Sequence, residues 1–127
     1  MAAALTLLGI DVTLSQIRIQ VGIVLSGNYA TFVAGPPPSG GDTIDFTPLL
    51  GQASGGVDIF IANDAPEYGV IQGSTGDDYT FVPGATLKTN LIAINTASNT
   101  QLGAGAYPAR ILGDLYLQGE FVFDKLV

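Results

Sequence analysis

Residues 10–25, with the sequence IDVTLSQIRIQVGIVL, decide the fold class of this chain. Apolar and polar residues alternate along it, which is typical of a strand with one buried face and one exposed face. The alternating apolar residues occupy even positions up to Leu14 and odd positions from Ile17 onward. Because side chains alternate between the two faces of a strand, this switch indicates a break or a bulge near Ser15 and Gln16. We therefore expect two short strands or one bulged strand here.

Short strands joined by tight turns account for most of the remaining chain. The sequence contains 17 Gly and 7 Pro spread over its length, which leaves few stretches long enough for a helix. Further strand patterns occur at residues 29–34, 43–46, 57–62, 68–72, 79–82, 110–117 and 120–124. Residues 85–102 are expected to run from a strand into a loop. The spacing of these segments predicts a single all-β domain, with one sheet closed on itself or packed in two layers.

The composition excludes several kinds of chemistry. The chain has no His and no Cys, so it has no imidazole base, thiolate nucleophile, zinc–thiolate site or disulfide. Its sequence has no Gly-x-Ser-x-Gly motif and no Ser three residues before a Lys, which are the usual settings of a catalytic serine. We therefore expect a protein that is not an enzyme and needs no cofactor.

The charge balance bears on the partners. Four basic residues stand against 11 acidic ones, and the net charge of −7 disfavours nucleic acid and anionic membranes. Only 12% of the residues are charged, against roughly 25% in an ordinary soluble domain. Because the centres of oligomer interfaces are depleted in charge, this composition is suited to contact with other subunits.

Carboxylate pairs are the remaining candidates for a chemical site. They are Asp42 with Asp45, Asp64 with Glu67, and Asp77 with Asp78. A calcium ion could use oxygen atoms of residues 63–67, but the segment lacks a calcium-loop signature. We interpret the acidic residues as solvent-facing charges at turns and expect no metal site.

Aromatic residues suggest a second way in which the domain could act. Sugar-binding modules stack sugar rings on exposed aromatic side chains, and Tyr68, Tyr79 and Tyr107 are the candidates here. The chain has no Trp, and aromatic residues in a small β domain commonly fill its core. Both interpretations stay open at this point.

The N-terminal residues 1–14 are largely apolar. No Lys or Arg precedes Arg18, so the charged region of a signal peptide is absent and we expect none. The segment is either an arm that contacts other subunits or an edge strand, and residues 15–127 form the β-sandwich domain. The candidate partner-contact residues are Leu5, Leu7, Leu8, Ile10 and Val12.

Four motifs, in this order along the chain, carry a resemblance to a known family. They are Gly27-Asn28-Tyr29, Gly40-Gly41-Asp42-Thr43-Ile44-Asp45-Phe46, Tyr79-Thr80-Phe81-Val82-Pro83-Gly84 and Leu102-Gly103-Ala104-Gly105-Ala106-Tyr107-Pro108-Ala109. Their pattern resembles the small head proteins of tailed phages known as decoration or cement proteins. The resemblance implies binding to the outside of a capsid shell, commonly as trimers and without enzymatic activity. It implies no individual site residue.

These observations lead to one expected function and one alternative. We expect a jelly-roll-like antiparallel β-sandwich with an extended N-terminal arm, acting as a non-enzymatic structural protein of the virion. It would bind the major capsid protein on the capsid exterior as a homo-oligomer, expected to be a trimer, with neither nucleic acid nor membrane as a partner. The alternative is a carbohydrate-binding β-sandwich module of a phage tail or surface adhesin.

Overall fold

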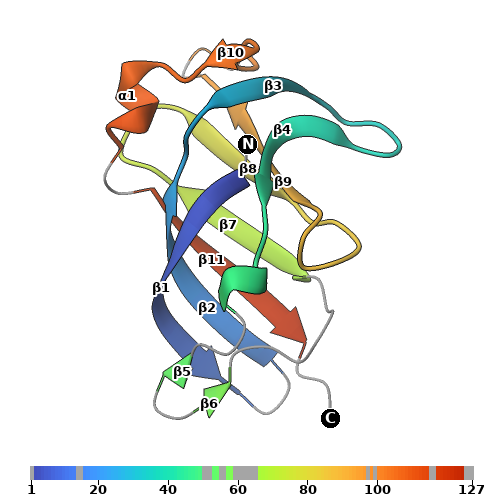
Figure 1. Cartoon of the computed structure of the whole chain (residues 1–127), viewed down its shortest axis with the longest axis vertical. Helices are drawn as coiled ribbons and strands as arrows, with labels where there is room; N and C mark the ends of the chain where they lie inside the picture. The colour runs from blue at the N-terminus through green and yellow to red at the C-terminus, as the bar shows by residue number, and fades with distance from the viewer. Residues whose placement is uncertain are drawn as a thin grey trace.

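The structure, a computed structural model, describes residues 2–13, 16–49, 53–54, 57–58, 66–96, 98, 100–114 and 117–124. Nearly all of the regular structure is β-strand (Figure 1). The strands are β1 (Ala2–Val12), β2 (Gln16–Val24), β3 (Asn28–Val33), β4 (Ser39–Ile44), β5 (Ala53–Ser54), β6 (Val57–Asp58), β7 (Tyr68–Gln72), β8 (Asp78–Val82), β9 (Asn90–Asn95), β10 (Gly105–Ala106) and β11 (Gln118–Asp124). The helical elements are a 3-10 turn, η1 (Thr47–Leu49), and a short helix, α1 (Ala109–Leu112).

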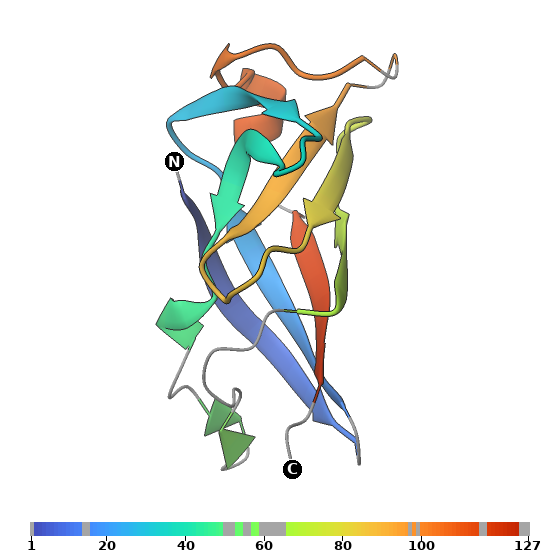
Figure 2. The ribbon, with the colours of Figure 1, turned by 90° about the vertical axis from the view of Figure 1, so that its right-hand side faces the viewer.

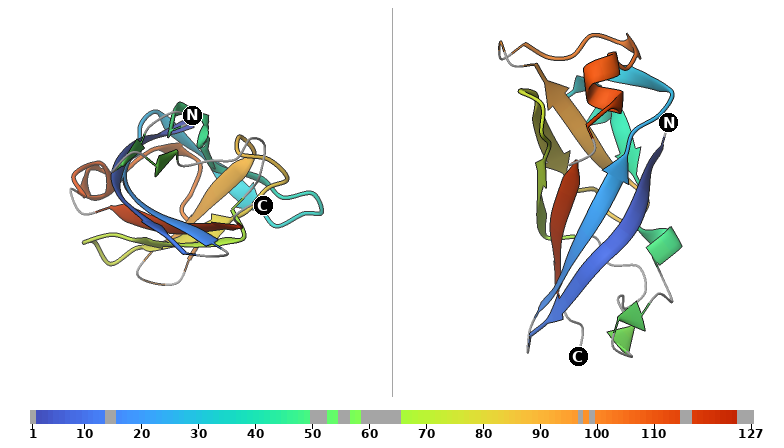
Figure 3. Two further views of the ribbon diagram at one scale, coloured as in Figure 1. Left: turned by 90° about the horizontal axis from the view of Figure 1, so that it is seen from below. Right: turned by 90° about the vertical axis from the view of Figure 1, so that its left-hand side faces the viewer.

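One sheet forms both layers of the domain. Its strand order is β1-β2-β11-β7-β8-β9-β4-β3-β10, and the pairs between consecutive strands in this order are antiparallel. Strands β1 and β4 also pair in parallel through Ala2 with Thr43 and Ala3 with Ile44, which closes the sheet on itself. Seen from below, the strands surround a common centre (Figure 3, left). The predicted all-β, sandwich-like domain is confirmed, and its two layers are continuous.

The β1–β2 hairpin explains the switch in sequence parity. Strand β1 ends at Val12, and the turn that follows is held by a 2.9 Å hydrogen bond from the Thr13 amide to the Gln16 carbonyl. The predicted break before residue 17 is therefore confirmed. A second switch lies inside β1, where Leu7 pairs with Val21 but Gly9 pairs with Gln20. The extra residue, Leu8, is a β-bulge, so inward positions are odd before it and even after it.

The N-terminal segment belongs to the sheet. Of the two alternatives for residues 1–14, the described residues 2–12 form a strand that pairs with β2 rather than a free arm. The physical reason is that Leu5, Leu7 and Ile10 pack against the hydrophobic core, which stabilises the strand through burial of apolar surface.

Phenylalanine side chains occupy the middle of the core. The ring of Phe46 makes edge-on contacts with Phe121 and Phe123, with centroids 4.9 Å and 5.5 Å apart. Gly69 on β7 leaves room for this cluster, because a Cβ atom there would lie 2.3 Å from Cδ1 of Phe121. The buried core also contains Ile19, Val21, Ile44, Leu49, Ile92 and Ile94. The core therefore draws on strands from both layers.

Most of the predicted strands are present. Residues 29–34, 68–72, 79–82 and 120–124 correspond to β3, β7, β8 and β11, and residues 85–102 run from β9 into a loop. The pattern at 43–46 overlaps the end of β4. Of residues 57–62, the first two form β6 and the others lie outside the described residues.

The prediction of a strand at residues 110–117 is wrong. Residues Ala109–Leu112 form helix α1, which follows Pro108. The carbonyl of Pro108 accepts hydrogen bonds from the amides of Ile111 and Leu112, at 3.0 Å and 3.2 Å. The turn buries Ile111, which is 2% exposed, and directs Arg110 toward the β7–β8 turn. Tertiary contacts outweigh the local strand pattern here.

Helix α1 and strands β3 and β10 gather at one end of the molecule. Figure 2 shows β3, β10 and α1 together at this end, whereas β5 and β6 lie at the opposite end. The layer formed by β1, β2, β11 and β7 runs between them. Its outer face is the main candidate for a functional surface.

Candidate functional site

The outer face of the β1-β2-β11-β7 layer carries a concentration of exposed apolar side chains. Figure 3 (right) shows β1 and β2 in blue beside β11 in red, with α1 at their end. Six large hydrophobic side chains are exposed in the described part of the chain, and only Val33 on β3 lies away from this region. The other five are Leu8 on β1, Val24 on β2, Tyr68 and Val70 on β7, and Leu112 on α1.

Charge is sparse on the same face. Arg18 and Glu120 form an ion pair at 3.4 Å, and Asp11 is paired with Arg18 in the strand register. These are the outward charged side chains that the structure describes in the four strands. Uncharged residues dominate the remaining outward positions, including Thr6, Gln20, Gln72 and Gln118. The face thus carries few charges, although the whole protein has a net charge of −7.

Two hollows mark this face, and they are adjacent, because Gln118 of one pairs in the register with Gly22 of the other. The hollow nearer α1 has a volume of about 250 Å³ and is bordered by Val24 and Leu112. Leu8 lies beside it, since its Cδ1 atom is 3.9 Å from the position of a Cβ on Gly22, which also lines the hollow. We call Leu8, Val24 and Leu112 the apolar patch.

The second hollow has a different lining. It measures about 300 Å³ and lies over β2, β11 and β7. We call it the amide groove, and its lining residues are Gln20, Val70, Gln72, Gln118, Gly119 and Glu120. Thr6 and Asp114 also line the hollow nearer α1, but glutamine amides line only the second hollow, so the two offer different chemistry to a partner.

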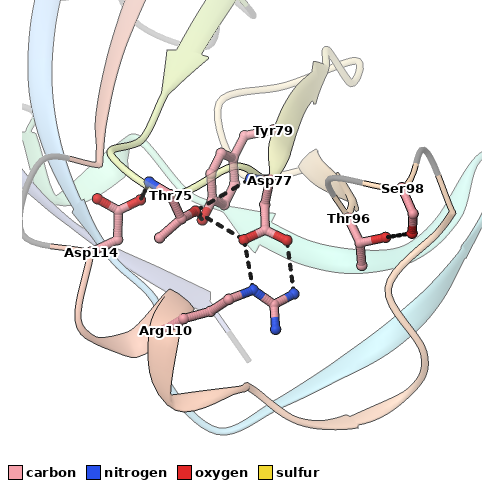
Figure 4. A network of polar contacts seen from close by, with 7 residues as sticks. All are labelled: Thr75, Asp77, Tyr79, Thr96, Ser98, Arg110 and Asp114. Carbon is pink, nitrogen blue, oxygen red and sulfur yellow. Dashed lines mark hydrogen bonds and ion pairs between the residues drawn. The ribbon is translucent and has the colours of Figure 1, made fainter.

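A polar network positions α1 and therefore the patch residue Leu112. The guanidinium group of Arg110 donates hydrogen bonds of 3.0 Å and 2.8 Å to the carboxylate of Asp77 (Figure 4). Asp114, just after α1, accepts a 2.8 Å bond from the amide of Ser74 in the β7–β8 turn. The bonds to Arg110 hold the pKa of Asp77 below its usual range. These contacts join α1 to the hairpin of β7 and β8.

A second polar cluster is fully buried. The hydroxyl of Tyr107 donates a hydrogen bond to the carboxylate of Asp42, which also accepts a 2.9 Å bond from the Thr43 amide. The ring of Tyr107 lies 6.1 Å from that of Tyr29, whose hydroxyl accepts a 3.0 Å bond from the Ile94 amide. Burial raises the pKa values of both Asp42 and Tyr107. The exposed fraction of Asp42 is 0%, so this carboxylate cannot reach a substrate.

The interpretation of the acidic residues as solvent-facing charges is therefore wrong for two of them. Asp42 is fully buried and Asp77 is only 7% exposed. Their partners, Tyr107 and Arg110, lie 65 and 33 residues away in the sequence. Glu67 and Asp78 are exposed as expected.

The structure also sorts the candidate aromatic and metal-binding residues. Tyr79 and Tyr107 are 7% and 5% exposed, so their rings cannot stack on a sugar, whereas Tyr68 is 49% exposed.

Asp64 and most of the segment 63–67 lie outside the described residues. Within the described ranges, no three acidic side chains gather into a metal-binding group. None of the helices described there has the length and apolar character needed to span a bilayer.

The predicted partner-contact residues divide into two groups. Leu5, Leu7 and Ile10 pack against the core, whereas Leu8 is 54% exposed because the bulge turns it outward. Val12 pairs with Ile17 in the register, and its side chain is outside the described part. Only Leu8 of the described candidates lies on the apolar patch.

Sequence reasoning missed the other two residues of the apolar patch, Val24 and Leu112. Val24 carries a local signal, since it is an apolar residue at an outward parity between the inward Ile23 and Leu25. Leu112 gave no such signal, because its position depends on α1. Comparison of the chain with protein-family models, curated proteins and solved structures found no match.

Proposed function

We propose that this protein is a non-enzymatic structural protein that binds a protein lattice through the apolar patch. The lattice would be that of a phage major capsid protein, with the protein on the capsid exterior as a decoration protein. The observation that supports this most is the apolar patch itself, Leu8, Val24 and Leu112, on a face with few charges. The absence of His and Cys from the sequence supports a role without catalysis.

The energetics of the patch suit repeated, modest contacts. Val24 is 62% exposed and Leu112 is 53% exposed, so covering each side chain gains about 1 kcal/mol. Three such side chains give weak binding on their own. A protein that joins neighbouring subunits many times over a shell adds these contacts as avidity.

The proposal includes self-association, with a trimer as the expected form. Closed symmetric oligomers present the same patch several times to a symmetric lattice, which multiplies the contacts without new chemistry. Light scattering at high micromolar concentration is expected to give the mass of a trimer. A monomeric mass under these conditions would contradict this part of the proposal.

Co-sedimentation with phage heads that lack the protein tests the lattice contact. Val24→Lys and Leu112→Lys each place a charge in the patch, and each is expected to weaken attachment by about tenfold, since the buried ammonium group has no partner. Val33→Lys is the matched control, because Val33 is 56% exposed but lies on β3, away from the patch. Circular dichroism checks that the variants fold. Full occupancy by Val24→Lys and Leu112→Lys, equal to that of Val33→Lys, would overturn the proposal.

A further inference from the structure

The amide groove has a lining that the apolar patch does not share. Strands β2, β11 and β7 are adjacent, and the register places Glu120 opposite both Gln20 and Val70. Two residues earlier on β11, Gln118 is opposite Gln72. The strands therefore bring three glutamine side chains and one carboxylate to a single hollow of about 300 Å³, which is at the lower end of the size of ligand sites.

The glutamine amides are available for a ligand. In the described part of the chain, the side chains of Gln20, Gln72 and Gln118 form no hydrogen bond with the protein. Each amide offers two N–H donors and one carbonyl acceptor. Such groups match hydroxyl groups, which both donate and accept hydrogen bonds.

The groove is close to neutral although the protein is acidic. Its one carboxylate, Glu120, is paired with Arg18 at 3.4 Å. The net charge of −7 disfavours an anionic ligand through long-range repulsion. A cationic ligand would offer no acceptor to the N–H donors of the glutamine amides. Charge complementarity therefore favours an uncharged ligand rich in hydroxyl groups.

Apolar side chains complete the groove along β7. Val70 lines it and is 55% exposed, and Tyr68 lies two residues before Val70 on the same outward face, 49% exposed. Successive outward residues of a strand lie side by side. The exposed ring can stack on the C–H face of a sugar while the amides bind its hydroxyl groups.

We propose that the amide groove binds a neutral saccharide. The groove shares no lining residue with the hollow beside the apolar patch, so one part of the face would hold the lattice and the neighbouring part would bind a glycan. Gln72 and Gln118 bind the hydroxyl groups, Val70 supplies the apolar part of the lining, and Tyr68 lies beside the groove as the next outward residue on β7.

A glycan array carrying neutral and uronic-acid-containing oligosaccharides tests this inference, followed by an NMR titration of the full chain with each neutral oligosaccharide bound. We expect binding to neutral glycans only, with shifts in the side-chain amide signals of Gln72 and Gln118. Gln118→Ala is expected to weaken binding by about five- to tenfold, through the loss of its hydrogen bonds. Tyr68→Ala is expected to have an effect of similar size. Thr80→Ala, at an exposed position on β8, is the matched control and is expected to bind like the wild type.

Three outcomes would overturn the inference. The first is no binding to any neutral glycan on the array at about 1 mM protein, a concentration that detects even weak sites. The second is equal binding to uronic acid oligosaccharides. The third is loss of head attachment in Gln118→Ala without any glycan binding, which would assign the groove to a protein partner. Val24→Lys is expected to keep its glycan binding, so failure of the lattice proposal and failure of this one are distinguishable.

Discussion

The hydroxyl of Tyr107 donates a hydrogen bond to the buried carboxylate of Asp42, 65 residues away in the sequence. Tyr107 follows β10, the strand at the end of the sheet, and Asp42 lies on β4. The bond therefore anchors the segment that leads into α1 to the closed part of the sheet. It also buries a carboxylate that accepts hydrogen bonds from two uncharged donors, the hydroxyl of Tyr107 and the amide of Thr43.

The burial of Asp42 predicts that the folded protein loses stability as the pH rises. Burial raises its pKa above the unfolded value of 3.8, so its contribution to stability is fully present below pH 3.8 and is lost as the pH rises through the folded-state pKa. Asn at this position stays uncharged and still accepts a hydrogen bond. We expect Asp42→Asn to be more stable than the wild type at pH 7 by about 1 kcal/mol, with the difference closing by pH 3. Urea unfolding at both pH values measures this. A variant less stable than the wild type at pH 7 would contradict it.

The ion pair of Asp77 with Arg110 predicts the opposite: here the folded protein loses stability as the pH falls. The bonds from Arg110 lower the pKa of Asp77, so its contribution to stability is present above pH 3.8 and is lost as the pH falls through the folded-state pKa. We expect Asp77→Asn to cost about 1 kcal/mol at pH 7, a modest value because Arg110 is half exposed, and less at pH 3. The adjacent and exposed Asp78 is the matched control, and Asp78→Asn is expected to leave the urea midpoint unchanged. Equal effects of the two substitutions would show that the Arg110 contact does not stabilise the fold.

Gly69 predicts a steric limit in the core. A Cβ atom there would lie 2.3 Å from Phe121 and 3.0 Å from Phe81, so Gly69→Ala is expected to destabilise the protein by about 1–3 kcal/mol through overpacking. A Cβ on Gly103 meets no atom within 4 Å, and Gly103→Ala is expected to change stability by less than about 0.5 kcal/mol. Thermal unfolding of the two variants is the measurement. A Gly69→Ala protein as stable as Gly103→Ala would refute the packing of the phenylalanine cluster.

The bulge in β1 predicts that the neighbouring residues Leu7 and Leu8 differ in how well they tolerate a charged side chain. Leu7 packs against the core, whereas Leu8 is 54% exposed. Leu7→Lys is expected to cost about 2–3 kcal/mol, since it loses apolar burial and brings a charge toward the core. Leu8→Lys is expected to cost less than about 0.5 kcal/mol. Chemical denaturation of both variants checks the register directly, because a regular strand without a bulge at Leu8 would shift which of the later residues face inward.

The sequence by itself determined the elements whose signals are local. Strands β7, β8 and β11 follow from alternating patterns bounded by Gly, Pro or Asn, and the break between β1 and β2 follows from the switch in parity near Ser15. These signals are readable because a half-buried strand imposes a period of two on its own residues. The all-β class of the domain follows from the same patterns.

Contacts between distant residues decided the rest. The sequence pattern at residues 110–117 predicted a strand, but Pro108 and the pairing of Arg110 with Asp77 accompany a helix there. The burial of Asp42 likewise depends on Tyr107, which no local pattern connects to it.

The candidate surface shows the same division. The sequence does not distinguish Leu8 from Leu5 and Leu7. Only the register of β1 with β2 shows that Leu8 faces outward. The amide groove requires Gln20, Gln72 and Gln118 to meet from three strands that are distant in the chain. The sequence alone determined which segments form strands, because that depends on each segment's own pattern. The tertiary structure decided which side chains share a surface, because the pairing of distant strands brings them together.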